Sequence, residues 1–258
     1  MSKTPTSFLK RMSQSRAVAR WARFARLAKS APLNDVRTLL TDAEALRVEL
    51  DAFRRVAEDR VRMPPIDAEK MRHPLGTDRS WRPELWKSRL SNGAIAAAES
   101  RSALGTELKV FHDCIESELT LRQVRNQRAE DLAPFGLRMD VFRFDGTFLS
   151  LVLDVPQMML DGLRLTHLVR LDLRVELEKP LEMFARLNVK HGPNTEQIVR
   201  EIPLSGTVES WVEFDLAYTK LNEKRIERAW IDLIFEGPQM NQVVLRDLNL
   251  SRHPRAEI

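Results

Sequence analysis

The residues best suited to chemistry include a histidine that stands beside a thiol. His112 directly precedes Asp113 and Cys114. A Cys–His pair could act as a nucleophile, because a neighbouring base activates the thiol. Adjacent residues on a strand point to opposite faces, however, so Asp113 is not expected to meet either His112 or Cys114, and adjacency argues against a catalytic group here. We therefore expect Cys114 to be a small buried side chain.

A second polar group is the run from Asn188 to Gln197, which contains His191, a Gly-Pro pair and Asn194. A loop at the rim of a rigid scaffold can bind a ligand. The same residues can instead build a turn in which His191 and Asn194 bond to the backbone. Both interpretations stay open. No metal site is expected, because His191 has no second His or Cys near it in the sequence.

Common catalytic and cofactor motifs are absent from the sequence. It contains no Gly-rich phosphate loop, no Gly-x-Ser-x-Gly, no His-Glu-x-x-His and no Cys-x-x-Cys. We therefore expect a non-catalytic protein that uses no cofactor. An enzyme that uses His191 or His112 is the alternative.

Two tryptophans alternate with apolar residues on segments that read as strands. Within 226–235, Ala229, Ile231, Leu233 and Phe235 predict a core face, and the opposite face carries polar and aromatic side chains. The expected ligand-binding residues are Trp211, Trp230, Arg228, Asp232, Arg186, Asn188, His191 and Asn194. Aromatic rings stack on apolar sugar faces, while charged and amide groups bond sugar hydroxyls. The set predicts a carbohydrate site. The alternative is that helices or a linker cover the tryptophans.

These residues lie in a region whose alternation of apolar and polar residues predicts strands throughout. The strand segments are 107–113, 117–124, 135–144, 147–155, 165–177, 182–190, 197–204, 209–216, 226–235 and 242–250. Alternation with one polar face is typical of antiparallel sheets, whereas parallel strands form continuous apolar runs. The pattern predicts a mainly β fold, an antiparallel β-sandwich or jelly roll, over residues 105–258. Arg246 and Asp247 in the last strand are typical of a sheet edge.

The N-terminal residues 1–31 predict a basic amphipathic helix. Residues 1–34 carry +8 and the whole chain +4, so residues 35–258 carry −4. Such a helix can lie on an anionic membrane or bind an acidic partner. It could equally be a basic tail on the acidic body, or an organelle targeting segment. The expected contact residues are Arg16, Arg20, Trp21, Arg23, Phe24 and Arg26. Nucleic-acid binding is not expected, because the body is acidic.

Residues 32–63 predict a second helix with a heptad pattern. Its apolar seam consists of Val36, Leu39, Ala43, Leu46, Leu50, Phe53 and Ala57. Alternating steps of three and four are typical of a coiled coil. Self-association through residues 34–60, giving a homo-oligomer, is one interpretation. The other is a helix folded back on the first helix or on the sandwich, because coiled coils this short are marginal alone.

Residues 64–104 predict a Pro-rich linker before the sandwich. Trp81 and Trp86 are too apolar to remain in solvent, so we expect them to pin the linker onto the sandwich. The stretch from Ala94 to Leu104 predicts one or two helical turns. The sandwich is expected to start near Gly105.

The strand rhythm from Gly105 to Arg252 resembles the jelly rolls of carbohydrate-binding modules and galactose-binding-like domains. Its most telling part is the final strand, 242–250, with a central acidic residue. The strings 188–197 and 214–218 are similar to those of a bacterial family of unknown function. The resemblance implies a jelly roll and glycan recognition, but it assigns no binding residue.

The compartment is predicted from features of the whole chain. A single cysteine favours a reducing compartment. No apolar run reaches the roughly 20 residues of a membrane span, and no export signal is readable. We expect a cytoplasmic protein, peripheral at a membrane if the first helix binds one.

Overall fold

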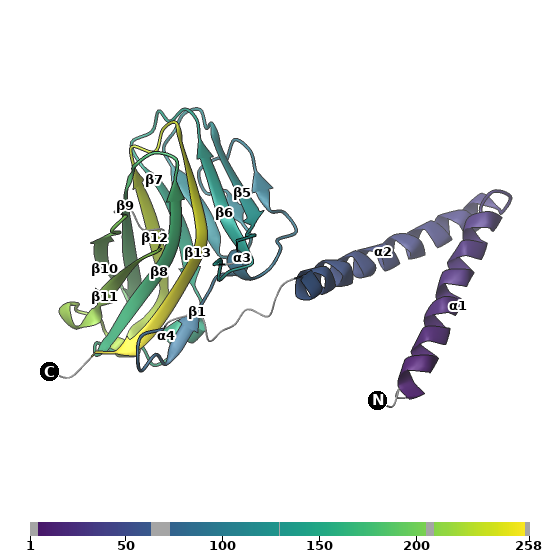
Figure 1. Ribbon diagram of the computed structural model, residues 1–258, viewed down its shortest axis with the longest axis horizontal. Coiled ribbons are helices and arrows are strands. Elements are labelled where there is room, and N and C mark those ends of the chain that lie inside the picture. Colours follow the sequence, from purple (N-terminus) through teal and green to yellow (C-terminus); the bar gives the residue numbers. More distant parts are fainter. Residues whose placement is uncertain (1–4, 63–72, 129, 205–208, 256–258) are drawn as a thin grey trace. The chain divides into compact units, whose positions relative to one another are not determined.

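The helical part of the chain comes first. The computed structural model describes residues 5–62, 73–128, 130–204 and 209–255, and the chain divides into two units, Met1–Glu58 and Asp59–Ile258. Helix α1 spans Pro5–Leu27 and helix α2 spans Leu33–Arg62, which confirms the predicted N-terminal helices (Figure 1). Asp35 lies in the first turn of α2, where the helix dipole favours a negative charge. No helix within the described ranges is long and apolar enough to cross a membrane.

The second unit is an antiparallel β-sandwich, as predicted. One sheet has seven strands in the order β11-β8-β13-β6-β5-β2, with β1 also paired to β13, and the other has six in the order β10-β9-β12-β7-β4-β3. The strands are β1 Arg79–Trp81, β2 Ala94–Ile95, β3 Ala103–Leu104, β4 Leu108–His112, β5 Leu119–Arg125, β6 Phe135–Val141, β7 Leu149–Val155, β8 His167–Leu177, β9 Glu182–His191, β10 Asn194–Glu201, β11 Glu209–Asp215, β12 Ile226–Glu236 and β13 Asn241–Pro254. Among the described residues, four short helical turns lie between these strands: α3 Glu84–Lys87, α4 Gln157–Leu160, η2 Leu216–Tyr218 and η3 Glu223–Arg225.

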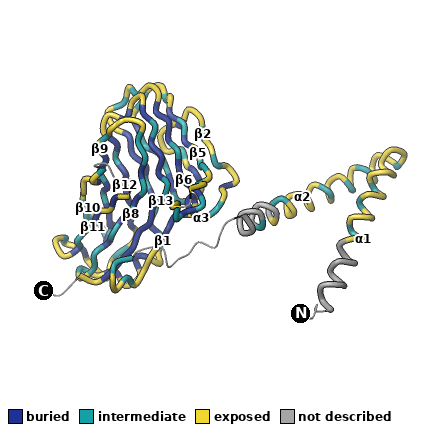
Figure 2. Tube along the Cα trace, viewed as in Figure 1, coloured by how far each residue is buried: buried dark blue, intermediate teal, exposed yellow. Residues whose placement is uncertain are grey.

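The core lies between the two sheets and is built by side-chain alternation. Ala229, Ile231, Leu233 and Phe235 of β12 are all buried, as their spacing predicts. The facing sheet contributes Leu171 and Leu173 of β8, among others. Buried residues concentrate on the sandwich strands, while most described positions of α1 and α2 are exposed (Figure 2). Burial of these apolar faces is the main force that holds the sheets together.

The sandwich begins well before Gly105. Described residues 73–104, predicted as part of a linker, contribute β1, α3, β2 and β3 to it. The prediction of a helix between Ala94 and Leu104 is wrong, because this stretch forms two short strands on different sheets. Trp81 and Trp86 are buried, and the Trp86 Nε1–H donates to the carbonyl oxygen of Leu245 at 3.0 Å. The expectation that both tryptophans pin this segment to the sandwich is confirmed.

The last strand occupies the centre of the seven-stranded sheet and not its edge. Strand β13 pairs with β8 on one side and with β6 on the other. Its register against β8 shifts between Leu245 and Asp247, which marks a β-bulge. At this bulge Arg82 donates Nε–H and Nη2–H to the two carboxylate oxygens of Asp247, at 2.9 and 2.7 Å. The charge of Asp247 therefore serves a buried ion pair, and its interpretation as an edge signal is wrong.

Candidate ligand-binding site

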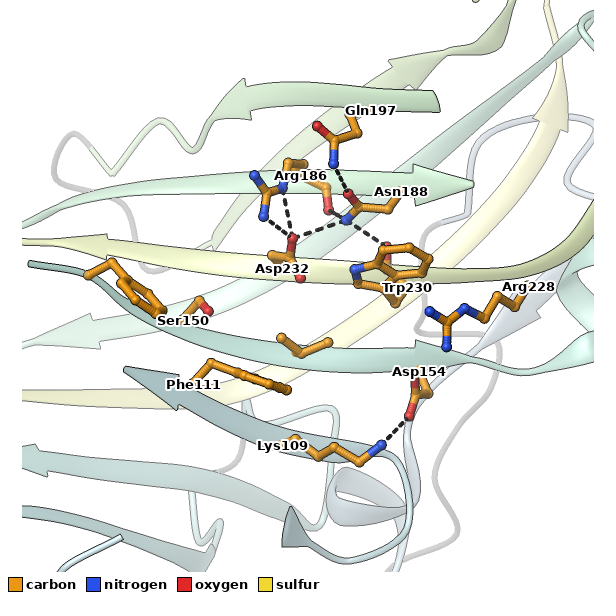
Figure 3. Close-up of a pocket in the computed structure, with 12 residues that line it drawn as sticks. Lys109, Phe111, Ser150, Asp154, Arg186, Asn188, Gln197, Arg228, Trp230 and Asp232 are labelled. Carbon is orange, nitrogen blue, oxygen red and sulfur yellow. Dashed lines mark hydrogen bonds and ion pairs between the residues drawn. The ribbon is translucent and has the colours of Figure 1, made fainter. Parts of the chain in front are cut away.

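An open groove of about 420 Å³ lies on the outer face of the six-stranded sheet, opposite the core (Figure 3). It is formed by side chains from β4, β7, β9, β10 and β12 and from the residue before β7. The lining residues are Lys109, Phe111, Phe148, Ser150, Val152, Asp154, Arg186, Asn188, Gln197, Arg228, Trp230 and Asp232. Its volume lies within the range of small-molecule sites, about 300–1,000 Å³.

Strand register explains why these side chains share one face. Asn188 of β9 is paired with Trp230 of β12 and with Gln197 of β10, and Trp230 is paired in turn with Asp154 of β7. Directly paired residues on neighbouring strands point to the same side of a sheet. The next row of the groove follows two residues along each strand, where Arg186 is paired with Asp232.

The floor of the groove is a closed polar network. The carboxylate of Asp232 accepts from Arg186 Nε–H at 2.7 Å and lies 2.6 Å from Arg186 Nη2. It also accepts from the Asn188 amide at 3.1 Å, and the Asn188 carbonyl accepts from Gln197 at 3.0 Å. Asp232 and Asn188 are both buried, so these bonds offset the cost of removing them from water.

One oxygen of the Asp232 carboxylate has spare acceptor capacity. All the bonds described above end on Oδ2. An ionised carboxylate has two acceptor oxygens, so Oδ1 can accept a hydroxyl of a ligand while Oδ2 stays bound to Arg186 and Asn188. The position of this oxygen is fixed before any ligand arrives, which lowers the entropic cost of binding.

An indole forms the neighbouring wall. Trp230 is half-buried, and the guanidinium carbon of Arg228 lies 4.8 Å from its ring centroid, a cation–π contact. Further along, Lys109 donates to Asp154 at 2.9 Å, and both side chains are partly exposed. The groove thus combines an aromatic surface with polar groups of both signs.

Trp211 lies on the other sheet. The prediction that Trp211 and Trp230 belong to one site is therefore wrong. Trp211 is half-exposed on the outer face of β11, with the Arg170 guanidinium 4.1 Å from its ring centroid. Arg170 also donates to Asp172 at 2.9 Å, and burial raises the pKa of Asp172 above its ordinary value. Alternation along each strand is correct for both tryptophans, but the two strands belong to different layers.

His191 and Asn194 occupy the hairpin between β9 and β10, outside the groove lining. They are register partners at its two ends. The buried ring of His191 accepts the backbone N–H of Asn222 at Nδ1, at 3.3 Å, and its Nε2 lies 3.5 Å from Glu196. This geometry agrees with the interpretation of a turn in which His191 bonds to the backbone.

His112 and Cys114 are not arranged as a nucleophile and base. The buried ring of His112 has Nε2 2.8 Å from the carbonyl oxygen of Ala98, and its Nδ1 accepts the backbone N–H of Cys114 at 3.2 Å. Burial raises the pKa of the Cys114 thiol, which disfavours the reactive thiolate. Both imidazole nitrogens therefore contact backbone groups.

The six predicted contact residues of the basic helix lie on the described part of α1. Four of these six residues are exposed, namely Arg16, Arg20, Arg23 and Arg26. Trp21 and Phe24 are half-buried and meet edge to face, with ring centroids 5.5 Å apart. Contact with a membrane or an acidic partner remains a prediction.

Seven groove residues were not anticipated from the sequence: Lys109, Phe111, Phe148, Ser150, Val152, Asp154 and Gln197. Six of them occupy outward positions of β4, β7 and β10, so side-chain alternation could have predicted that they point away from the core. Which strands are neighbours is set by long-range pairing, and no short motif marks it.

A family model described as "Family of unknown function (DUF6478)" matches residues 1–258. The chain belongs to this family. The match spans the helical unit as well as the sandwich, so the DUF6478 family includes both. Comparison with curated proteins gave no significant match.

Solved structures similar to this DUF6478 chain include sugar-binding proteins. A xylan-binding domain from Paenibacillus barcinonensis matches with a TM-score of 0.38 and 8% identity, over 63% of this chain and 99% of that one. A family 11 carbohydrate-binding module from Clostridium thermocellum, in complex with a mixed-linked tetrasaccharide, gives 0.35 and 10%, over 64% and 98%. The enzymatically active domain of tailspike protein 4 from bacteriophage CBA120 gives 0.38 and 10%, over 62% of this chain but only 21% of the tailspike. No binding residue is transferred from these proteins.

Proposed function

We propose that the protein is a non-catalytic binding protein that recognises an oligosaccharide in the groove of the six-stranded sheet. The observation that supports this most is the arrangement around Trp230 and Asp232. A half-exposed indole stands beside a buried carboxylate whose Oδ1 is available and whose orientation is fixed by Arg186. A sugar needs both elements, because each ring has an apolar face for stacking and hydroxyls for directed hydrogen bonds.

The open form of the groove favours a chain of sugars over a compact ligand. Polar side chains from several strands extend from Gln197 at one side to Lys109 at the other. An extended ligand could contact the indole with one ring and the Lys109–Asp154 pair with another. Arg228 adds a cation above Trp230, which favours a ligand that carries a carboxylate.

Binding suits the groove better than hydrolysis does. Glycoside hydrolysis commonly requires two carboxyl groups, one of which must donate a proton. The two groove carboxylates, Asp154 and Asp232, are each ion-paired, with Lys109 and Arg186 respectively. Proton transfer from either one would first require that the ion pair break.

The proposal is tested by isothermal titration calorimetry with four probes: cellohexaose, xylohexaose, a β-1,4-galactan oligosaccharide and an oligogalacturonide. We expect at least one to bind, and we expect Trp230→Ala to weaken that binding about tenfold or more, equivalent to about 1.4 kcal/mol. Asp232→Asn should weaken it as well, because the amide cannot accept at both of its terminal positions.

Trp211→Ala is the matched control, since it removes an equally large indole from the outer face of the other sheet. It should leave the affinity unchanged. Thermal melting of each variant separates loss of binding from loss of folding. No binding of any probe, or equal losses in the two tryptophan variants, would refute the proposal. Cleavage of a bound probe would refute its non-catalytic part.

A further inference from the structure

Helix α2 exposes a row of large apolar side chains. Leu46, Leu50 and Phe53 are 41%, 57% and 70% exposed and follow one another at steps of four and three along a helix of 30 residues. Residues at this spacing lie on one stripe of the helix. The preceding seam residues, Val36, Leu39 and Ala43, are half-buried. An exposed apolar row of this kind is typical of a surface that binds another protein segment.

The charges on the two sides of this stripe differ in sign. In a heptad lettered a to g, Val36, Ala43 and Leu50 take position a, and Leu39, Leu46 and Phe53 take position d. The g positions on one flank are then Asp35, Asp42 and Glu49, all acidic. The e positions on the other flank are Leu40, Arg47 and Arg54, of which the last two are basic.

This distribution of charge favours a second copy of the same helix as the binding partner, and it favours a parallel orientation. In a parallel, in-register pair of helices, each g residue faces the e residue that lies five positions later on the other helix. Asp42 then faces Arg47 of the second copy, and Glu49 faces Arg54 of the second copy. An antiparallel pair places e beside e and g beside g, which brings like charges together.

We propose that α2 forms a parallel, in-register two-stranded coiled coil with α2 of a second copy of this chain. The apolar stripe supplies the attraction, and the acidic and basic flanks fix the orientation. Arg47 is free to change partner, because its present contact is an exposed pair with Asp51 at 4.0 Å, a distance at which ion pairs contribute little. The inference is independent of the groove and of its ligand.

Sedimentation velocity of the full chain over a range of concentrations tests the association. The wild type is expected to give a species of twice the chain mass that dissociates on dilution. Asp42→Lys with Glu49→Lys makes both flanks basic, and Arg47→Glu with Arg54→Glu makes both acidic. Each double variant should be monomeric alone, and an equimolar mixture of the two should regain the dimer.

Glu44→Lys with Asp51→Lys is a control that changes the net charge by the same amount as Asp42→Lys with Glu49→Lys. Both residues take position b, away from the seam, so this variant should dimerise like the wild type. Circular dichroism confirms that each variant keeps its helices. A monomeric wild type, or a dimer that survives both flank reversals, would overturn the proposal.

Cysteine cross-linking tests the orientation. In a Cys114→Ser background, Ala43→Cys places a thiol at position a, where the same residue of a parallel second copy lies directly opposite. Oxidation should link this variant to itself, and likewise a Leu50→Cys variant. If each fails alone and a cross-link forms only when Ala43→Cys is mixed with a d-position variant such as Phe53→Cys, the pair is antiparallel, because position a then lies opposite position d, and the inference is wrong.

Discussion

Replacing Arg82 with alanine is expected to destabilise the sandwich strongly. Arg82 and Asp247 are both more than nine-tenths buried and form a two-pronged ion pair. Removing one partner of a buried pair leaves an uncompensated charge, which costs about 3–5 kcal/mol. Replacing both, as in Arg82→Met with Asp247→Leu, should restore most of that stability, because no charge then stays buried.

The pH dependence of this loss gives a second readout. Burial already holds the pKa of Asp247 above its ordinary value, and Arg82 opposes that shift. Without Arg82 the pKa of this carboxyl rises further, so the folded variant binds a proton more readily than its unfolded chain does. Its stability relative to the wild type should therefore recover as the pH falls from neutral towards about 4.

Urea unfolding followed by tryptophan fluorescence measures both effects, since Trp81 and Trp86 are buried close to the pair in sequence. Lys109→Ala is the control, because Lys109 and Asp154 form an exposed pair worth less than about 1 kcal/mol. If Arg82→Ala lowers the free energy of unfolding no more than this control does, the buried Arg82–Asp247 pair does not stabilise the sandwich. A loss that grows as the pH falls would contradict the assigned pKa shift.

Three further predictions concern the same part of the sandwich. Trp86→Ala should lower the free energy of unfolding by about 3–5 kcal/mol in urea, because a fully buried indole and its bond to Leu245 are lost. Gly136→Ala should cost about 1–3 kcal/mol in the same assay, since its added Cβ would lie 2.8 Å from the Leu245 carbonyl oxygen. A hydrogen bond from Arg252 holds the pKa of Asp78 below its ordinary value of 3.8. Asp78 therefore adds stability that is present above about pH 4 and lost on further acidification, and Asp78→Asn should flatten the acid limb of the unfolding curve.

The sandwich itself could be predicted because alternation reports burial directly. The apolar set of β12, from Ala229 to Phe235, is buried as its spacing indicates, and the ten predicted strand segments all correspond to strands. The role of Trp86 was also predictable, because a large apolar ring in a Pro-rich segment must be covered. These inferences depend only on local pattern and on the cost of exposing apolar surface.

Strand order could not be predicted, and the composition of the site depends on it. Alternation places Trp211 and Trp230 on outward faces but does not say of which sheet. The position of Asp247 could not be predicted for the same reason. A charged residue in the last predicted strand is compatible with an edge strand and equally with a buried ion pair to Arg82. Arg186, Asn188 and Asp232 were predicted together and do meet, because their strands β9 and β12 are direct neighbours.

The central place of β13 has a consequence for how the protein is made. Strands β8 and β6 leave the ribosome long before residues 241–254, yet they meet only through this last strand. The seven-stranded sheet therefore cannot close until β13 has been synthesised, and before that its apolar face stays exposed in the nascent chain, which favours aggregation. A stop codon just before residue 241 would remove a central strand of this sheet, so the truncated product should be insoluble.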